Sequence, residues 1–385
     1  MGAKGFETPS LRAFFPEFRG NEPAFAKVRA IPHTLVRMRL LPFLLPLALV
    51  GLLTAARAQS LDAASRAALE QAAVKTLQQR YILPERLAQL PERLEVHRAR
   101  LDAAPDAPAY AQALGQVLEA LTQDRHVRVS YSPTPLPADL SHTEGSVGEE
   151  FRRNRFTNQG VIRVERLPGN LGYLDLRAFT EKRQSKPKLD AAMALLADTE
   201  ALIIDLRHNG GGYPQTVAYL SSFFLKPRVH LNDVVWRTAW GESRESFHTE
   251  RVGLQYDKPV WLLISPRSFS AAEGFAYNLQ QLQRVQIAGQ PSGGGAHPGG
   301  MHKIGAHFSL FVPNGRSVSP TTGGNWEGVG VQPDVLLPAH DDALRVAQLR
   351  LLEHIKTQGS PHPDPRYQRG LEARIQELQA AAPKP

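Results

Sequence analysis

The sequence predicts an α/β core preceded by a small bundle of helices. Between residues 161 and 338, apolar runs of strand length alternate with helix-like segments, and two of these runs lead through a turn into a helix. Such alternation is typical of a largely parallel sheet covered by helices. Residues 61–122 instead carry apolar side chains at helical spacing, as at Leu69, Ala73 and Leu77, which predicts the bundle.

The predicted elements follow in chain order. Residues 59–131 form the helical domain, with a break at Tyr81–Pro84, and the Pro-, Ser- and Gly-rich residues 132–160 form a linker or flap. The core spans residues 161–338, with strands at 172–176, 201–206, 260–264, 286–288 and 307–312 and helices at 188–196, 214–224 and 271–282. The polar tail, residues 339–385, is predicted to be helical and either to dock on the core or to fray.

The N-terminal residues are typical of an exported protein. Two arginines precede an apolar run from Leu40 to Ala55, and Ala56–Ala58 then offers small residues at both positions of a cleavage site, so residues 38–58 are predicted to be a signal peptide. Residues 1–37 lack periodicity and are expected to be a disordered upstream extension. The apolar run is short and contains two prolines, so we expect no stable membrane span after cleavage and a periplasmic or secreted protein.

Composition excludes several classes of function. The chain has no cysteine, which excludes disulfides, thiol catalysis and cysteine-based metal sites. Five of the eight net positive charges lie in residues 1–58, and no basic stripe with interleaved aromatics follows, so nucleic-acid binding is not expected. The pair His297 and His302 matches no recognised zinc spacing, and we expect neither a metal nor a cofactor.

Ser270 is the strongest candidate for chemistry. It stands where the apolar run at 260–264 turns into the predicted helix 271–282. The free N–H groups and the positive end of a helix favour negative charge there, which suits a nucleophile whose attack creates an oxyanion. Glu273 follows three residues later, so Ser270 could equally be the cap of a capping box, or Ser268 could be the cap.

Three further segments carry candidate groups. The glycines in Asp205–Gly212, between a strand and a helix, let backbone N–H groups approach a ligand, as oxyanion donors, a phosphate cradle or a plain turn. His126 could be a general base, and Glu327, in a glycine-flanked loop, could orient that base or be an ordinary surface carboxylate. Other histidines compete for the role of base, namely His208, His297 and His302.

These motifs together resemble the tail-specific, or C-terminal processing, serine peptidase clan. The resemblance is greatest to the branch of tricorn-type proteases and interphotoreceptor retinoid-binding protein repeats, and it covers roughly residues 65–338. It rests on segments that occur in the same order: Tyr81–Pro84, Asp124–Val129, Leu167–Leu174, Asp205–Gly212, Ser270–Glu273, Gly293–His297 and Glu327–Asp334.

The resemblance implies a crotonase/ClpP-like core and a role for each matching residue. Ser270 matches the nucleophile, and Gly211 with the backbone of Ala271 matches the oxyanion donors. His126 and Glu327 match the base and the acid of the tricorn-type arrangement. Many members of the clan use a lysine about 25 residues after the serine. Glycine stands at that distance here, so a Ser–Lys dyad looks absent.

The same resemblance adds two candidates for substrate binding. Arg125 stands where the clan has a small residue before the histidine, and it could crowd the site or bind a substrate carboxylate. His297, at the end of the glycine-rich segment, is the second. Peptide-binding PDZ modules, which are common in the clan, are missing from this chain.

We therefore expect an exported serine peptidase that hydrolyses peptides or unfolded proteins through an acyl-enzyme. The alternatives are a non-catalytic carrier of apolar ligands, as the retinoid-binding relatives imply, and a pseudo-peptidase. The sequence specifies neither the cleavage preference nor the oligomeric state.

Overall fold

The computed structural model describes residues 61–140, 150, 152–338, 343–358 and 364–381. The predicted extension at 1–37, the predicted signal peptide at 38–58 and part of the predicted flap lie outside these residues. In the part that is described, no helix combines the length and apolar character needed to span a bilayer.

A six-stranded sheet forms the core and confirms the predicted α/β class. Its strands are parallel except for β2, which pairs antiparallel with β3 at one edge. Every residue of β3 and β4 is buried, as expected for central strands covered on both faces. In sheet order the strands are β12 (Val335–Leu336), β8 (Gln286–Gly289), β7 (Val260–Ile264), β4 (Ala201–Asp205), β3 (Leu171–Leu176) and β2 (Val161–Leu167).

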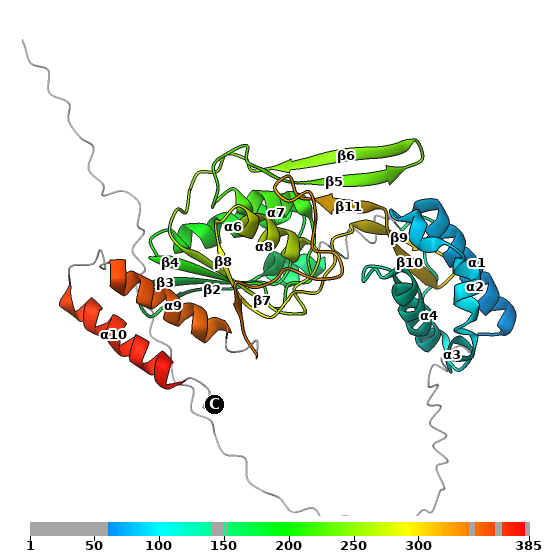
Figure 1. Ribbon diagram of the computed structural model, residues 1–385, viewed down its shortest axis with the longest axis horizontal. Helices are drawn as coiled ribbons and strands as arrows, with labels where there is room; N and C mark the ends of the chain where they lie inside the picture. Colours follow the sequence, from blue (N-terminus) through cyan, green and yellow to red (C-terminus); the bar gives the residue numbers. More distant parts are fainter. Residues whose placement is uncertain (1–60, 141–149, 151, 339–342, 359–363, 382–385) are drawn as a thin grey trace, which may run out of the picture. The chain divides into compact units, whose positions relative to one another are not determined.

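Helices cover both faces of this sheet (Figure 1). Helices α6 (Lys182–Leu196), α7 (Pro214–Ser221) and α8 (Ala271–Gln281) share one apolar cluster with one face. Helices α9 (Ala343–Gln358) and α10 (Pro365–Ala380) pack against the other face. The tail therefore docks on the core, because α9 and α10 bury leucines and isoleucines at helical spacing against the strands.

The N-terminal helices form a second core with a small antiparallel sheet. That sheet has the order β1-β10-β9, and its Val129, Phe308 and Leu310 pack among the helices. The elements are α1 (Ala63–Arg80), η1 (Pro84–Leu87), α2 (Leu90–Glu95), α3 (Arg98–Asp102), α4 (Ala107–Thr122), β1 (Arg128–Tyr131), β9 (Gly299–Lys303) and β10 (Phe308–Pro313). The chain segment before β9 therefore leads from the α/β core directly to the helical bundle.

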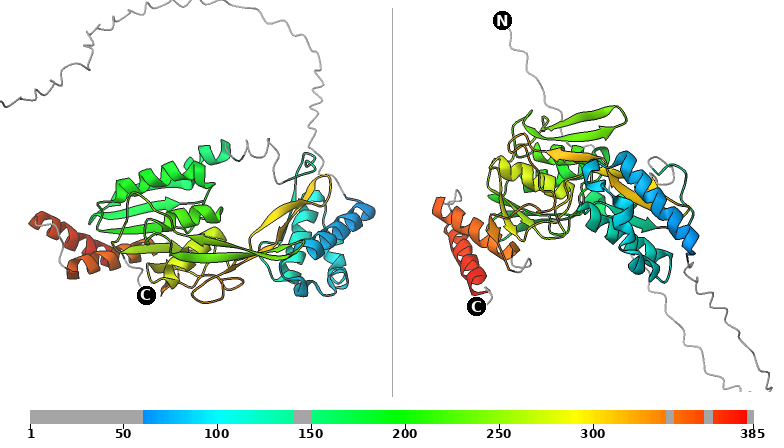
Figure 2. Two further views of the ribbon diagram at one scale, coloured as in Figure 1. Left: turned by 90° about the horizontal axis from the view of Figure 1, so that it is seen from above. Right: turned by 45° about the vertical axis from the view of Figure 1, so that its right-hand side comes forward.

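A third sheet was not predicted from the sequence. It has the order β11-β5-β6 and consists of the hairpin β5 (His230–Thr238) and β6 (Gly241–His248) with β11 (Gly315–Val318) (Figure 2). Most side chains of β6 are exposed, so the strand lacks the apolar alternation by which strands are found. A short 3₁₀ helix, η2 (Asn158–Gly160), ends the predicted flap and leads into β2.

Candidate active site

Ser270 occupies a sharp turn between β7 and α8. It is the N-cap of α8, with φ 56° and ψ −119°. Non-glycine residues rarely adopt a positive φ, and such backbone strain is concentrated at functional sites. The turn places the serine at the N-terminal end of the helix, as predicted, and this strand–turn–helix geometry is the one that exposes a nucleophilic serine.

Glu273 fixes this turn. Its buried carboxylate accepts the Ser270 N–H at 2.7 Å, as the capping interpretation predicted. The same carboxylate also accepts the N–H groups of Gly294, at 2.6 Å, and Gly295, at 2.9 Å, and the Ser292 hydroxyl at 2.6 Å. Burial raises the pKa of Glu273, although these hydrogen bonds oppose the shift. Glu273 thus ties the serine turn to the glycine-rich loop.

The two predicted oxyanion residues lie beside Ser270. A Cβ at Gly211 would be 2.8 Å from the Ser270 Cβ and 2.9 Å from the Ala271 nitrogen, and Gly211 has a φ of +102°, so only glycine fits. The Gly211 N–H donates to Asn209 Oδ1 at 2.9 Å. Asn209 is fully buried and also donates to the Leu176 carbonyl at 2.9 Å, which fastens the glycine turn to the end of β3.

His126 lies against the residue that precedes the serine. Its ring centroid is 4.5 Å from that of Phe269 and 5.8 Å from that of Phe311. Burial lowers the pKa of His126 to about 4, so the imidazole is neutral at neutral pH. Its Nδ1 atom is buried without a hydrogen-bond partner. A Cβ at Gly295 would come within 2.6 Å of the His126 Cε1, so the absence of a side chain there leaves room for the ring.

Asp124 is the carboxylate nearest to His126. Its Oδ1 accepts the His126 backbone N–H at 3.0 Å and lies 3.9 Å from the His126 Nδ1. Its Oδ2 accepts the Tyr81 hydroxyl at 3.1 Å and pairs with His297 Nδ1 at 2.8 Å. Burial raises the pKa of Asp124, but the hydrogen bond and charge interaction with His297 and the hydrogen bond from the His126 backbone together outweigh it and hold the pKa below its usual value. Asp124 is therefore charged and oriented from several sides.

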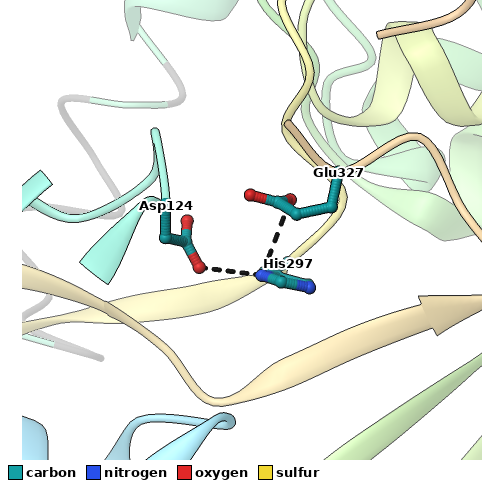
Figure 3. A group of neighbouring side chains, drawn as sticks. All are labelled: Asp124, His297 and Glu327. Atoms are coloured by element: carbon teal, nitrogen blue, oxygen red, sulfur yellow. Dashed lines mark hydrogen bonds and ion pairs between the residues drawn. The ribbon is translucent and has the colours of Figure 1, made fainter. Parts of the chain in front are cut away.

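Glu327 lies next to His297 rather than His126 (Figure 3). One carboxylate oxygen, Oε2, accepts the Ala296 N–H at 2.6 Å and lies 3.5 Å from His297 Nδ1. The other, Oε1, is buried and has no partner. Burial raises the pKa of Glu327 to about 7. Among the described residues, no hydrogen bond joins Glu327 to His126, so the direct contact that the Ser–His–Glu arrangement implies is not formed.

The two predicted substrate-binding residues are both engaged with the protein. Arg125 donates from its guanidinium to the Gly293 carbonyl and so joins the helical bundle to the glycine-rich loop. Arg125 also lines two open surface hollows. His297 has 4% of its side chain exposed and pairs with Asp124. The sequence assigned no role to Asp124 or Phe269, although Asp124 stands two residues before the predicted base.

A small cavity of about 70 Å³ adjoins the candidate nucleophile. Ser270, Ala271 and Gly274 line it. Its apolar lining residues include Val217, Pro298 and Trp326. The cavity can therefore hold a small apolar side chain next to the serine hydroxyl.

Comparison with known proteins finds a family match over part of the chain. Residues 170–337 match Peptidase family S41, a range that contains Ser270, Gly211 and Glu327 but begins after His126. A carboxy-terminal-processing protease of Bartonella bacilliformis is 30% identical over 194 residues, which are 46% of this chain and 42% of the relative. The chain thus spans less than half the length of that relative.

Two solved structures share the fold. A putative peptidase from Parabacteroides merdae superposes with a TM-score of 0.50 at 17% identity, covering 71% of this chain and 89% of its own. A lipoprotein from Streptococcus agalactiae superposes with a TM-score of 0.51 at 14% identity, covering 75% and 97%. At these identities the likeness concerns the fold alone.

Proposed function

We propose that this chain, which carries a Peptidase family S41 domain over residues 170–337, is an exported serine peptidase that cleaves peptides or unfolded proteins. The observation that carries the proposal is the Ser270 turn. It combines a strained serine at a helix N-terminus, two neighbouring backbone N–H groups and an adjoining cavity.

Ser270 attacks the peptide carbonyl and Ala271 helps to hold the oxyanion. The Ala271 nitrogen is at the first turn of α8, where its N–H and the helix dipole favour the developing charge. Gly211 contributes its N–H once the substrate oxygen displaces Asn209 Oδ1, the present acceptor. Each such donor contributes about 3 kcal/mol to stabilisation of the transition state.

His126 accepts the proton of the Ser270 hydroxyl. Neutral imidazole is the form that can accept it, and burial keeps His126 in that form. The imidazolium that results is stabilised by the charged Asp124. Glu327 acts as a positioning residue, through His297 and Asp124, rather than by direct contact with His126.

The cavity favours hydrolysis over ligand carriage. A carrier of retinoid-sized or lipid-sized ligands needs an apolar cavity of about 300–1,000 Å³. The cavity at Ser270 has about 70 Å³, which suits one small apolar side chain of a peptide. We therefore propose that cleavage follows small apolar residues. The name of the Bartonella relative indicates a proteolytic role for that protein.

Export is proposed from the N-terminal sequence. The basic residues before the apolar run at 40–55, and the small residues that follow it, are the features of a secretory signal. A periplasmic or secreted location would give the enzyme access to unfolded chains outside the cytoplasm.

The variant Ser270→Ala tests the proposal. We expect hydrolysis of an unfolded protein such as casein to fall at least 10³-fold, because the proposed acyl-enzyme forms on the Ser270 hydroxyl. Ser243→Ala, at an exposed position of β6, is the matched control and should retain full activity. Unchanged hydrolysis by the folded Ser270→Ala protein would exclude the proposed nucleophile.

A further inference from the structure

We propose that Asp124, His297 and Glu327 form a binding site for a divalent transition metal of the zinc type. The site shares Asp124 and Glu327 with the proposed serine chemistry, but its test needs no peptidase activity. The site could not be predicted from the sequence, because the three residues are far apart along the chain and match no zinc motif.

The three side chains converge on one point. Each contributes a ligand atom, and these atoms all lie within 4.8 Å of one another (Figure 3). His297 Nδ1 is 2.8 Å from Asp124 Oδ2 and 3.5 Å from Glu327 Oε2. Ligand atoms bound to zinc at about 2.0–2.2 Å lie roughly 3.3–3.5 Å apart, so shifts of about 1 Å or less would place all three around one ion.

An unpartnered atom points to a missing ligand at this place. Glu327 has only 8% of its side chain exposed, yet its Oε1 has no hydrogen-bond partner. Figure 3 shows the Glu327 carboxylate extending toward Asp124 and His297. A buried carboxylate oxygen without a partner is costly, and a bound cation would supply the interaction that the protein does not.

The mixture of ligand atoms selects the class of metal. Imidazole nitrogen with two carboxylates suits zinc and its first-row neighbours, whereas calcium and magnesium prefer oxygen ligands alone. Two carboxylates also balance the charge of a divalent ion. The metal would take the place of the proton that His297 Nδ1 shares with Asp124.

A path for entry and a fourth ligand are both available. An open hollow of about 820 Å³ borders Asp124 and Glu327 on the side of α4. Three protein ligands leave one position of a tetrahedral ion free, and a water molecule from this hollow can fill it. Other polar residues that line the hollow are Arg86, Gln116, Glu119 and Gln123.

Titration of the untagged full chain with ZnCl₂, after removal of metals with EDTA, tests the inference. We expect isothermal titration calorimetry to show a saturable site with one zinc ion per chain. Glu327→Gln keeps the shape of the side chain but loses its charge, and His297→Ala removes the nitrogen. Each variant should bind zinc at least tenfold more weakly. His302→Ala, in the neighbouring strand β9, is the control and should bind like the wild type.

Circular dichroism and the absorption of bound Co²⁺ distinguish a lost metal ligand from a misfolded variant. Circular dichroism of the metal-free proteins shows which variants are folded. If His297→Ala is unfolded, Glu327→Gln alone is compared with the wild type. Co²⁺ in place of zinc should give the visible absorption of a four-coordinate site, and this absorption should be lost in folded Glu327→Gln. Absence of saturable binding to the wild type, or equal affinity of the folded Glu327→Gln and wild-type proteins, would overturn the inference.

Discussion

Asp124 is the carboxylate that lies nearest to His126, the proposed base, among the described residues. It is fully buried, it bonds the His126 backbone, and its Oδ1 is 3.9 Å from the His126 Nδ1. The family resemblance assigned the acid to Glu327, which lies against His297 instead. The closer carboxylate should therefore have the larger effect on the base.

Replacing Asp124 by Asn should lower kcat by about 10²-fold or more, because the imidazolium would lose its nearest negative charge. The charge of Asp124 also raises the pKa of His126, so its removal should move the acid limb of the pH–rate profile to lower pH. Steady-state kinetics across pH measure both effects.

Tyr81→Phe is the matched control, since it removes only the hydroxyl that donates to Asp124 Oδ2. It should cost about 1 kcal/mol of unfolding free energy and leave kcat nearly unchanged. A loss of activity in Tyr81→Phe as large as that in Asp124→Asn would mean that Asp124 acts only by supporting the fold.

The pKa of His126 predicts how the activity depends on pH. Below its pKa of about 4 the imidazole is protonated and cannot accept the serine proton, so kcat/KM should fall as the pH is lowered through about 4. Between pH 5 and 6.5 this base should impose no loss. The assay should contain EDTA, to keep the neighbouring cluster free of metal. An acid limb near pH 6.5 that persists in Glu327→Gln, and so does not come from Glu327 with its pKa of about 7, would indicate an exposed histidine as the base.

The loop between β8 and β9 contacts both the first turn of α8 and His126. At Gly295 the loop passes between Phe269 and His126. A Cβ there would be 2.3 Å from the Phe269 ring, so no side chain fits at this position. The buried Glu273 links this loop to the first turn of α8. Ser270 is thus hydrogen-bonded through Glu273 to the loop against which His126, the proposed base, packs.

Glu273→Gln tests this junction. The amide presents N–H donors where the carboxylate accepted four hydrogen bonds, so at least one buried donor loses its partner. We expect the free energy of unfolding to fall by about 1–3 kcal/mol, and kcat to fall with it. Urea denaturation measures the former. Glu242→Gln, on the exposed strand β6, should change the unfolding free energy by less than about 0.5 kcal/mol.

Elements with strong apolar patterns could be predicted from the sequence. The strand at 260–264 and the helix after Ser270 occur where the patterns placed them, within a residue or so. The hairpin β5–β6 was missed because polar side chains dominate β6. A pattern identifies a strand only when one of its faces is buried.

The candidate site could be predicted only in part, for a different reason. Ser270, Gly211 and Ala271 belong to neighbouring strand–turn–helix units, whose ends meet at the same edge of a parallel sheet. The Asp124–His297 contact depends on the packing of the β9–β10 segment against the helical bundle. Local spacing holds no information on such a contact, so the pairing of Glu327 with His297 was not foreseen.

At the scale of the whole molecule, the two faces of the central sheet have separate roles. Helix α8 and the serine turn lie on one face, whereas α9 and α10 cover the other. Leu352 of α9 is fully buried against that second face. The tail should therefore contribute to stability without contributing to the chemistry.

Leu352→Ala should lower the free energy of unfolding by about 2–5 kcal/mol, because it removes buried methyl groups and leaves a cavity. At a temperature where the protein remains folded, kcat should be unchanged. Arg350→Ala, an exposed position of the same helix, is the control for both measurements. A fall in kcat without a fall in stability would place the tail in the catalytic machinery.

Labelling with a fluorophosphonate, followed by peptide mapping, tests most directly whether Ser270 is an activated nucleophile paired with His126. We predict one modified residue, Ser270, and loss of labelling in a folded His126→Ala variant. Labelling of a different serine, or no labelling of the folded wild-type protein, would contradict the account.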